Sequence, residues 1–196
     1  MRIFGVILAG GQARRLGGAD KALARLGDAT LLGHVLARFE PQVERVALSA
    51  NGDAGRFAAY GLPVLADGGG ARGPLSGILS GLTWAAAQGA TALVSVPVDG
   101  PFLPPDLVPR LCLAATDAGP ALAASPGGWH PTFGLWPVAL AEPLAAFLGT
   151  GATARVRDFA LAHDVRIASF PDDLAFANAN TAQDLTRLAA LLAGAP

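Results

Sequence analysis

Residues 3–21 read IFGVILAGGQARRLGGADK. The stretch begins with a continuous apolar run, Ile3 to Leu8, of the kind found in strands that are buried on both faces of a parallel sheet. A loop rich in glycine and arginine follows at once, from Gly10 to Asp20. Because open parallel sheets bind ligands beyond the carboxyl ends of their strands, this loop is the first place to expect a binding site.

The rest of the chain alternates further apolar runs with helical patterns. Predicted strands cover residues 43–49, 63–66, 91–98, 121–125, 132–136 and 165–170. Predicted helices cover residues 30–39, 54–60, 75–87, 105–115, 140–147, 154–162 and 182–192. Alternation of this kind builds a mainly parallel sheet with helices on both faces. We therefore predict the α/β class, with one domain over residues 1–196, a three-layer α/β/α architecture and a mostly parallel sheet.

Composition restricts the classes of function. The 196 residues are 52% hydrophobic and 15% charged, which is typical of a globular chain. The formal net charge of -1 lacks the basic excess that nucleic-acid binding usually needs. Cys112, the only cysteine, is interpreted as a core thiol, so no internal disulfide can form. Since we find no export signal or membrane span, we expect a cytoplasmic protein with no nucleic-acid or membrane partner.

The loop after the first strand has the chemistry of a polyphosphate site. Its glycines let backbone N–H groups approach an anion closely. Arg14, Arg15 and Lys21 add three positive charges within eight residues, a density that suits a triphosphate. The P-loop pattern requires Gly-Lys followed by Ser or Thr, which this loop lacks, so it does not indicate a P-loop ATPase.

A second glycine-rich segment is a false lead. Residues 68–73, GGGARG, match the dinucleotide-binding pattern G-x-G-x-x-G literally. The strand before them is short and is not the first of the chain, and Pro74 follows directly. The acidic residue expected about twenty positions on is missing, since Asp99 comes later. The segment therefore does not indicate a dinucleotide site.

Three polar residues follow predicted strands. Asp99 ends an apolar strand, where a carboxylate is costly unless it is solvated or coordinated, and Mg²⁺ prefers one or two carboxylates plus phosphate oxygens and water. A turn before Gly-Pro would also explain it. Asp67 could accept hydrogen bonds from a guanine ring edge, bind ribose, or form an Asp-Gly turn. Asn51 begins an Asn-Gly-Asp sequence that forms turns readily and could also contact a ligand.

The glycine-rich loop also resembles a known signature. Leu8-Ala9-Gly10-Gly11, a spacer, Arg15-Leu16-Gly17 and a further Asp20-Lys21 are similar to the signature of the nucleotidyltransferase superfamily. Gly10-Gly11 with Asp20-Lys21 most resembles the molybdenum cofactor guanylyltransferase family. The likeness covers most of the chain and includes residues 73–77 (GPLSG), Asp99 and residues 178–181 (NANT). Leu16 replaces a methionine that is commoner in the family.

This resemblance implies a Rossmann-like nucleotidyltransferase fold and a Mg²⁺-dependent enzyme, with Mn²⁺ as an alternative metal. Such an enzyme transfers GMP from GTP to molybdenum-molybdopterin and releases pyrophosphate. The N-terminal part, up to about residue 100, would bind GTP, and the C-terminal part molybdopterin. The implied GTP-binding residues are Leu8, Ala9, Gly10, Gly11, Lys21, Asn51, Asp67, Gly73 and Asp99. Lys21, Arg15 and Asp99 would be catalytic, with Asp99 as the metal ligand.

The second substrate is expected near the segment before the last helix. Thr181 and Asp184 form a capping-box-like pair, which does not account for Asn178 and Asn180. Alternation would place both amides on one face, and paired amides can bind the donor–acceptor edge of a pterin. The family resemblance assigns the two asparagines to molybdopterin.

Three further residues could reach the same substrate. His130 lies in a His-Pro-Thr segment that resembles one in the family, although a structural role would also explain a lone histidine. Arg155 and Arg157 could meet the molybdopterin phosphate, and a solvated helix face explains them equally well. The resemblance also implies transient contact with other proteins of cofactor assembly and with acceptor enzymes.

The implied mechanism needs little acid–base chemistry. The molybdopterin phosphate would attack the α-phosphorus of GTP in line, and Lys21 and Arg15 would stabilise the leaving pyrophosphate. Two alternatives stay open. One is another small nucleotidyltransferase, which uses CTP with molybdopterin or with a sugar phosphate. The other is a non-catalytic GTP-binding carrier of the cofactor.

Overall fold

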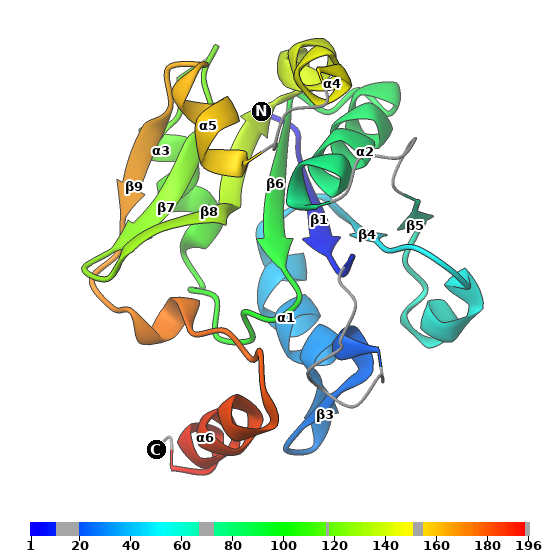
Figure 1. Cartoon of the computed structure of the whole chain (residues 1–196), viewed down its shortest axis with the longest axis vertical. Helices are drawn as coiled ribbons and strands as arrows, with labels where there is room; N and C mark the ends of the chain where they lie inside the picture. The colour runs from blue at the N-terminus through cyan, green and yellow to red at the C-terminus, as the bar shows by residue number, and fades with distance from the viewer. Residues whose placement is uncertain (11–19, 67–72, 117, 151–154, 195–196) are drawn as a thin grey trace.

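The computed structural model describes residues 1–10, 20–66, 73–116, 118–150 and 155–194. A seven-stranded sheet forms its centre, in the order β5-β4-β1-β6-β8-β7-β9 (Figure 1). The strands are β1 Ile3–Leu8, β4 Arg45–Ser49, β5 Val64–Leu65, β6 Ala92–Pro97, β7 Ala121–Ser125, β8 Gly128–Pro137 and β9 Arg166–Ser169. Within this sheet β8 runs antiparallel to both neighbours, and the other pairs are parallel. The prediction of a mostly parallel sheet is confirmed.

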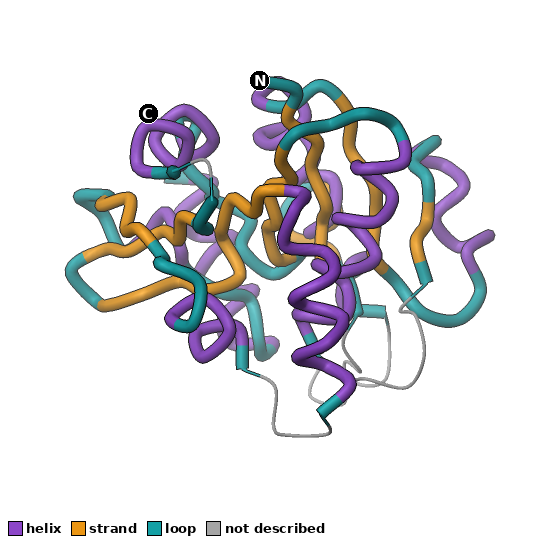
Figure 2. Tube along the Cα trace, turned by 90° about the horizontal axis from the view of Figure 1, so that it is seen from above, coloured by secondary structure: helices purple, strands orange, loops and turns teal. Residues whose placement is uncertain are grey.

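Helices lie on both sides of the sheet, as Figure 2 shows from a perpendicular direction. The α-helices are α1 Leu31–Phe39, α2 Pro74–Ala87, α3 Leu107–Ala114, α4 Ala141–Gly149, α5 Val156–Leu161 and α6 Ala182–Ala193. The short 3-10 helices are η1 Lys21–Leu23, η2 Glu40–Gln42, η3 Ala54–Tyr60, η4 Val138–Leu140 and η5 Leu174–Phe176. This arrangement confirms the three-layer α/β/α architecture. Among the described helices, none combines the length and the apolar character that a membrane crossing requires.

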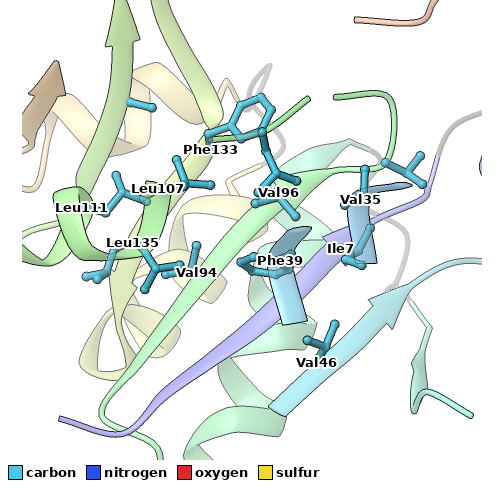
Figure 3. Close-up of a cluster of buried hydrophobic side chains, with 14 of the residues drawn as sticks. Ile7, Val35, Phe39, Val46, Val94, Val96, Leu107, Leu111, Phe133 and Leu135 are labelled. Atoms are coloured by element: carbon cyan, nitrogen blue, oxygen red, sulfur yellow. The ribbon is translucent and has the colours of Figure 1, made fainter. Parts of the chain in front are cut away.

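Two apolar layers flank the sheet, because successive side chains of a strand point to opposite faces. One layer packs α1 and α3 on the sheet, and Figure 3 shows part of it, namely Ile7, Val35, Phe39, Val46, Val94, Val96, Leu107, Leu111, Phe133 and Leu135. The other layer packs α2, α4 and α5 against Phe4, Val6, Leu93, Leu122 and Trp136. Strands β1 and β6 supply both layers, which explains their continuous apolar sequences.

Helix α2 approaches the sheet through two glycines. A Cβ atom on Gly77 would lie 2.5 Å from Ser49 Oγ and 2.8 Å from Leu8 Cδ2. One on Gly81 would lie 2.8 Å from Leu93 Cδ2. Packed interiors leave no room for such an atom, so only glycine permits this approach. Since Leu8 and Ser49 end β1 and β4, the contact at Gly77 fixes where α2 begins relative to the carboxyl ends of both strands.

Several elements differ from the predictions, and the helix predicted over residues 54–60 is the 3-10 helix η3. Strand β8 begins at Gly128 rather than at residue 132, because the turn after Ser125 lets it pair with β7 from its first residue. A two-stranded ribbon, β2 Arg25–Leu26 with β3 Ala29–Thr30, was not predicted. It packs against α6, which lies apart from the main sheet in Figure 1, through Leu26 of β2 and Leu188 of α6. Leu31, at the start of α1, and Ala179, before α6, complete this apolar cluster.

Candidate active site

The carboxyl ends of β1 and β6 lie side by side at the edge of the sheet. The two strands pair in parallel with Leu8 opposite Pro97, and Val98 N donates to Leu8 O at 3.1 Å. Gly10 opens the glycine-rich loop just past β1, and Asp99 stands just past β6. Parallel pairing therefore brings the start of this loop and this carboxylate, which are distant in sequence, to the edge where such sheets bind ligands.

A charged cluster forms at this edge from three segments. The Lys21 Nζ atom lies 2.6 Å from Asp99 Oδ2 and 2.6 Å from Asn180 Oδ1. The Lys21 and Asp99 side chains are 17% and 22% exposed, so the pair is shielded from bulk water but still accessible. Both contacts are charge-assisted hydrogen bonds, which are stronger than neutral ones. The structure thus unites residues that the sequence assigned to two different substrates.

Asp20 fixes the backbone on which Lys21 stands. Its Oδ1 atom accepts a hydrogen bond from Ala22 N at 3.0 Å, which caps η1 at its first turn. Ala22 itself is buried in the core layer under α1. Both sequence neighbours of Lys21 are therefore fixed, Asp20 by its hydrogen bond and Ala22 by burial. Lys21 is also the only lysine of the chain.

The segment that carries the two asparagines is tied to Asp99 through the backbone. Ala179 N donates to Asp99 O at 2.9 Å. Ala179 is buried, whereas Asn178 and Asn180 are exposed. The expectation that alternation places both amides on one face agrees with this burial pattern.

Helix α6 anchors the far end of the same segment. The Thr181 hydroxyl accepts from Asp184 N, and the Asp184 carboxylate accepts from Thr181 N at 2.9 Å, which is the predicted capping box. The hydrogen bond from Thr181, followed by those from backbone N–H groups, lowers the pKa of Asp184 below its ordinary value.

His130 contacts a polar side chain, Ser125, and stacks on an aromatic ring, Phe176. Its Nε2 lies 2.6 Å from Ser125 Oγ, and its ring stacks on Phe176 with centroids 4.1 Å apart and planes 7° from parallel. Burial lowers the pKa of His130, and the nearby Asp173 charge opposes that shift. The stack gives His130 a packing role on the element that leads into the asparagine segment. Its assignment to molybdopterin stays a prediction.

Arg56, in η3, is a site residue that sequence reasoning missed. Its Nε atom lies 2.5 Å from Asp20 Oδ2, and its Nη2 donates to Asn51 O at 2.7 Å. Nη1 donates to Asp53 O, and the guanidinium lies 4.3 Å from the centroid of the Phe57 ring. The sequence offered only a faint signal, an arginine that follows an Asn-Gly-Asp turn.

The remaining predicted residues divide into two groups. Gly11, Arg15 and Asp67 lie outside the described residues. Among the others, Ala9 N donates to the last carbonyl of β4 at 2.9 Å. Gly73 precedes α2 with φ of 120°, a conformation that side chains disfavour.

Of the two arginines considered for the second substrate, Arg157 lies over the Trp129 ring at 4.6 Å. Arg155, at the N-cap of α5, is exposed. Their assignment to a substrate phosphate stays a prediction.

Asp99 offers a place for a divalent metal that arrives with a polyphosphate. Within the described ranges, no group of three or more His, Cys, Asp or Glu side chains could hold a metal ion. Mg²⁺ is usually held by one or two carboxylates, with substrate phosphate oxygens and water as its other ligands. A single carboxylate at a strand end, accessible to solvent, fits this mode of metal binding.

The fold and the site together define the class of protein. A glycine-rich segment follows β1, and Lys21 just beyond it contacts Asp99 past the neighbouring strand β6. Such a cation and carboxylate beyond a parallel sheet suit the transfer of a nucleotidyl group. The chain belongs to the family described as the MobA-like NTP transferase domain, whose model matches residues 5–167.

Individual relatives agree with this family. The chain is 56% identical over 192 residues to a molybdenum cofactor guanylyltransferase from Cereibacter sphaeroides, with 98% of both chains covered. The crystal structure of molybdopterin-guanine dinucleotide biosynthesis protein A from Archaeoglobus fulgidus shares the fold, with a TM-score of 0.76 at 18% identity over 98% of this chain and 100% of that one. A manganese complex of a Mycobacterium tuberculosis H37Rv protein matches with a TM-score of 0.67 at 21% identity over 97% and 99% of the two chains.

Proposed function

We propose that this nucleotidyltransferase transfers GMP from GTP to molybdenum-molybdopterin, forming the guanine dinucleotide cofactor and releasing pyrophosphate. The close relative from Cereibacter sphaeroides carries the name of that activity. Within the chain, the observation that carries the proposal is the contact of Lys21 with both Asp99 and Asn180. It gathers the cation that we propose to bind phosphate, the carboxylate that we propose to hold the metal, and an amide at one point.

The residues of the chain act mainly by position and charge. In the proposed reaction Lys21 binds phosphate oxygens of GTP and stabilises the leaving pyrophosphate, with Arg15 as a second cation. Asp99 would hold Mg²⁺, or Mn²⁺ in its place, and the metal would neutralise phosphate charge. The attacking phosphate of molybdopterin is ionised near neutral pH, so no strong general base is required.

We assign GTP to the part of the chain up to about residue 100 and molybdopterin to the C-terminal part. Leu8, Ala9, Gly10, Gly11, Asn51, Asp67 and Gly73 belong to the GTP side of this proposal, and Asn178, Asn180 and His130 to the other side. The hydrogen bond from Lys21 supports a place for Asn180 at the boundary, next to both substrates. The proposal includes a cytoplasmic location and transient contact with proteins of cofactor assembly and with acceptor enzymes.

A nucleotide competition experiment tests the proposal. Pyrophosphate release is measured with purified protein, Mg²⁺ and molybdenum-molybdopterin, with GTP or CTP as donor. We expect release with GTP and little with CTP. Equal or faster release with CTP, or release that requires a sugar phosphate instead, would favour the other nucleotidyltransferases. GTP binding without any release would favour a non-catalytic carrier.

A further inference from the structure

We propose that Arg56 is a positioning residue that sets the affinity for GTP by joining the loop after β4 to the residue that precedes Lys21. This inference rests on the proposed function, because it assigns a task to a residue beside the GTP site. Arg56 is not proposed to touch the nucleotide. It acts through Asp20 on one side and through residues 51–53 on the other.

The guanidinium of Arg56 joins segments that follow neighbouring strands. Its Nε atom contacts Asp20 Oδ2 at 2.5 Å, and Asp20 lies at the end of the loop that follows β1. Its two terminal nitrogens donate to the carbonyls of Asn51 and Asp53, just past β4. The planar fork of arginine can serve several acceptors in fixed directions, which lysine cannot do. One side chain therefore fixes Asp20 relative to the loop after β4.

The position of Lys21 depends on the same contact. The two carboxylate oxygens of Asp20 have different partners, with Oδ2 on Arg56 and Oδ1 on Ala22 N. Because Lys21 lies between Asp20 and Ala22 in sequence, the orientation of this carboxylate fixes the backbone from which the lysine extends. Without Arg56, Asp20 would lose the partner that holds Oδ2.

Charge gives a second reason. Asp20 is an anion directly before the lysine that is proposed to bind phosphate, and an unpaired anion there would repel GTP. The Arg56 and Asp20 side chains are 26% and 23% exposed, so their pair is only partly screened by water. Arg56 thus neutralises a charge that would oppose binding of the nucleotide.

The loop after β4 gains its shape from the same residue. Gly52 has φ of 85°, a left-handed conformation that glycine adopts without strain, and Asp53 Oδ1 accepts from Gly55 N at 2.8 Å. Arg56 holds the carbonyls on both sides of Gly52. The backbone of Asn51, which belongs to the proposed guanosine side, is therefore fixed before any ligand binds.

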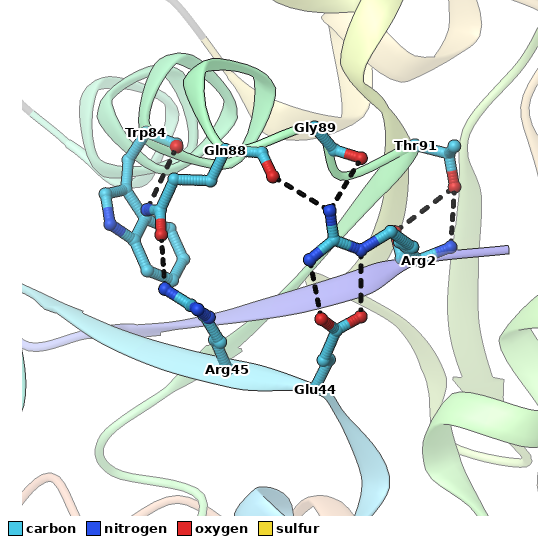
Figure 4. Close-up of polar contacts among 7 residues, drawn as sticks. All are labelled: Arg2, Glu44, Arg45, Trp84, Gln88, Gly89 and Thr91. Carbon is cyan, nitrogen blue, oxygen red and sulfur yellow. Dashed lines mark hydrogen bonds and ion pairs between the residues drawn. The ribbon is translucent and has the colours of Figure 1, made fainter.

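A matched control exists at the opposite edge of the sheet. Arg2 contacts Glu44 through Nε and Nη2 and donates to the carbonyls of Gln88 and Gly89 (Figure 4). Its guanidinium also lies over the Phe4 ring, 5.5 Å from the centroid. It therefore has the same kinds of partner as Arg56, namely a carboxylate, two carbonyls and an aromatic ring. Its partners stand at the amino ends of the strands, away from the proposed site.

The experiment compares Arg56→Ala and Arg56→Lys with Arg2→Ala. We expect Arg56→Ala to raise the KM and the calorimetric Kd for GTP about tenfold, with a smaller change in kcat and in the KM for molybdopterin. Arg56→Lys keeps the positive charge but lacks the planar guanidinium with its several donors. It should therefore retain only part of the affinity for GTP. Arg2→Ala should leave the KM for GTP unchanged. An unchanged KM for GTP in Arg56→Ala, or an equal rise in Arg2→Ala, would overturn the inference.

A double variant separates the charge from the fold. Asn at position 20 keeps the cap of η1 but removes the anion, so Arg56→Ala combined with Asp20→Asn should bind GTP more tightly than Arg56→Ala alone. Equal or weaker binding by the double variant would contradict the role of charge. Wild-type protein that binds GTP but releases no pyrophosphate would refute the proposed function, and the calorimetric comparison would still decide the role of Arg56.

Lysine labelling gives a readout that does not depend on turnover. Because Lys21 is the only lysine, an amine-reactive acylating reagent with peptide mapping reports on this one side chain, separately from the N-terminus. We expect faster labelling of Lys21 in Arg56→Ala than in the wild type, and wild-type labelling in Arg2→Ala. Identical labelling in all three proteins would contradict the coupling of Arg56 to Lys21.

Discussion

Two arginine clusters stand at opposite edges of the same sheet and use the same chemistry. Arg2 contacts Glu44 and the carbonyl of Gln88 at the amino ends of β1, β4 and β6. Arg56 contacts Asp20 and two carbonyls beyond the carboxyl ends of β1 and β4. The first cluster ties together the starts of strands. The second ties Asp20, directly before Lys21, to the loop after β4, beside the proposed GTP site.

The comparison shows that the kinds of partner that an arginine contacts do not reveal its role in the protein. What differs is the segment that each arginine holds. The amino ends of parallel strands receive the chain from preceding elements, whereas the loops beyond the carboxyl ends are where ligands of such sheets bind. Substitutions at the two edges should therefore separate effects on stability from effects on the reaction.

The largest contrast is expected between Asp99 and Glu44, the carboxylates of the two edges. Asp99→Asn should lower kcat by about a hundred- to a thousand-fold, because it removes the charge that would hold the metal against the phosphates. Glu44→Gln should leave kcat unchanged and lower the thermal midpoint slightly. Pyrophosphate release and thermal unfolding measure the two effects. Near-normal turnover of Asp99→Asn would remove the proposed metal site.

Lys21 should come next. Lys21→Ala removes the cation proposed to bind the triphosphate, and we expect GTP affinity to fall roughly tenfold to a hundredfold, with a parallel loss of turnover. Arg45→Ala, which removes a cation from the opposite edge, is the control and should leave GTP binding unchanged. Calorimetry with GTP and Mg²⁺ checks both. Unchanged affinity of Lys21→Ala would mean that the triphosphate binds elsewhere.

The two asparagines should separate the substrates more finely. Asn178→Ala should raise the KM for molybdopterin about tenfold and leave GTP binding unchanged, since Asn178 stands on the proposed pterin side. Asn180→Ala should impair both substrates, because Asn180 also accepts a hydrogen bond from Lys21. Kinetics with each substrate varied in turn measure the split. If Asn178→Ala weakens the binding of GTP as much as that of molybdopterin, the division of the two sites is wrong.

The smallest effect concerns His130 and acid. Burial lowers the pKa of His130 from 6.5, so the unfolded chain takes up a proton at a pH where the folded histidine is still neutral. The contribution of His130 to the free energy of unfolding is complete above the pKa that this histidine has in the unfolded chain. It is lost as the pH falls toward the lower pKa that His130 has in the folded protein. Urea unfolding at about pH 7.5 and about pH 5.5 should therefore show a smaller loss of free energy in His130→Gln than in the wild type.

The acidic group near His130 does not change its charge between about pH 5.5 and about pH 7.5. Asp173, the nearby acid, has a pKa below its ordinary value of 3.8, first because of the hydrogen bond from Ser125 and then that from Gly127 N. Asp173 therefore stays ionised over the whole range. If the free energy of unfolding falls by the same amount in His130→Gln as in the wild type, another group causes the acid sensitivity.

Local patterns predicted much of the fold and singled out the residues that meet at the candidate site. The apolar runs of β1 and β6 identified the central strands because both strands are buried on two faces. The short ribbon β2–β3 escaped prediction, since two-residue strands carry no periodicity. Lys21, Asp99 and Asn180 were each singled out from sequence, whereas their mutual contact was not.

The sequence by itself singled out the residues proposed to carry the chemistry: a glycine-rich loop followed by a lysine, an aspartate after a buried strand, and paired asparagines before a helix. Each of these is a local pattern, and local patterns record what the nearby backbone and solvent require. The tertiary structure decided which of them meet. The bonds from Lys21 to Asn180 and from Arg56 to Asp20 depend on strand order and on how close the helices pack, and these arise from the burial of the whole core rather than from any single stretch of chain.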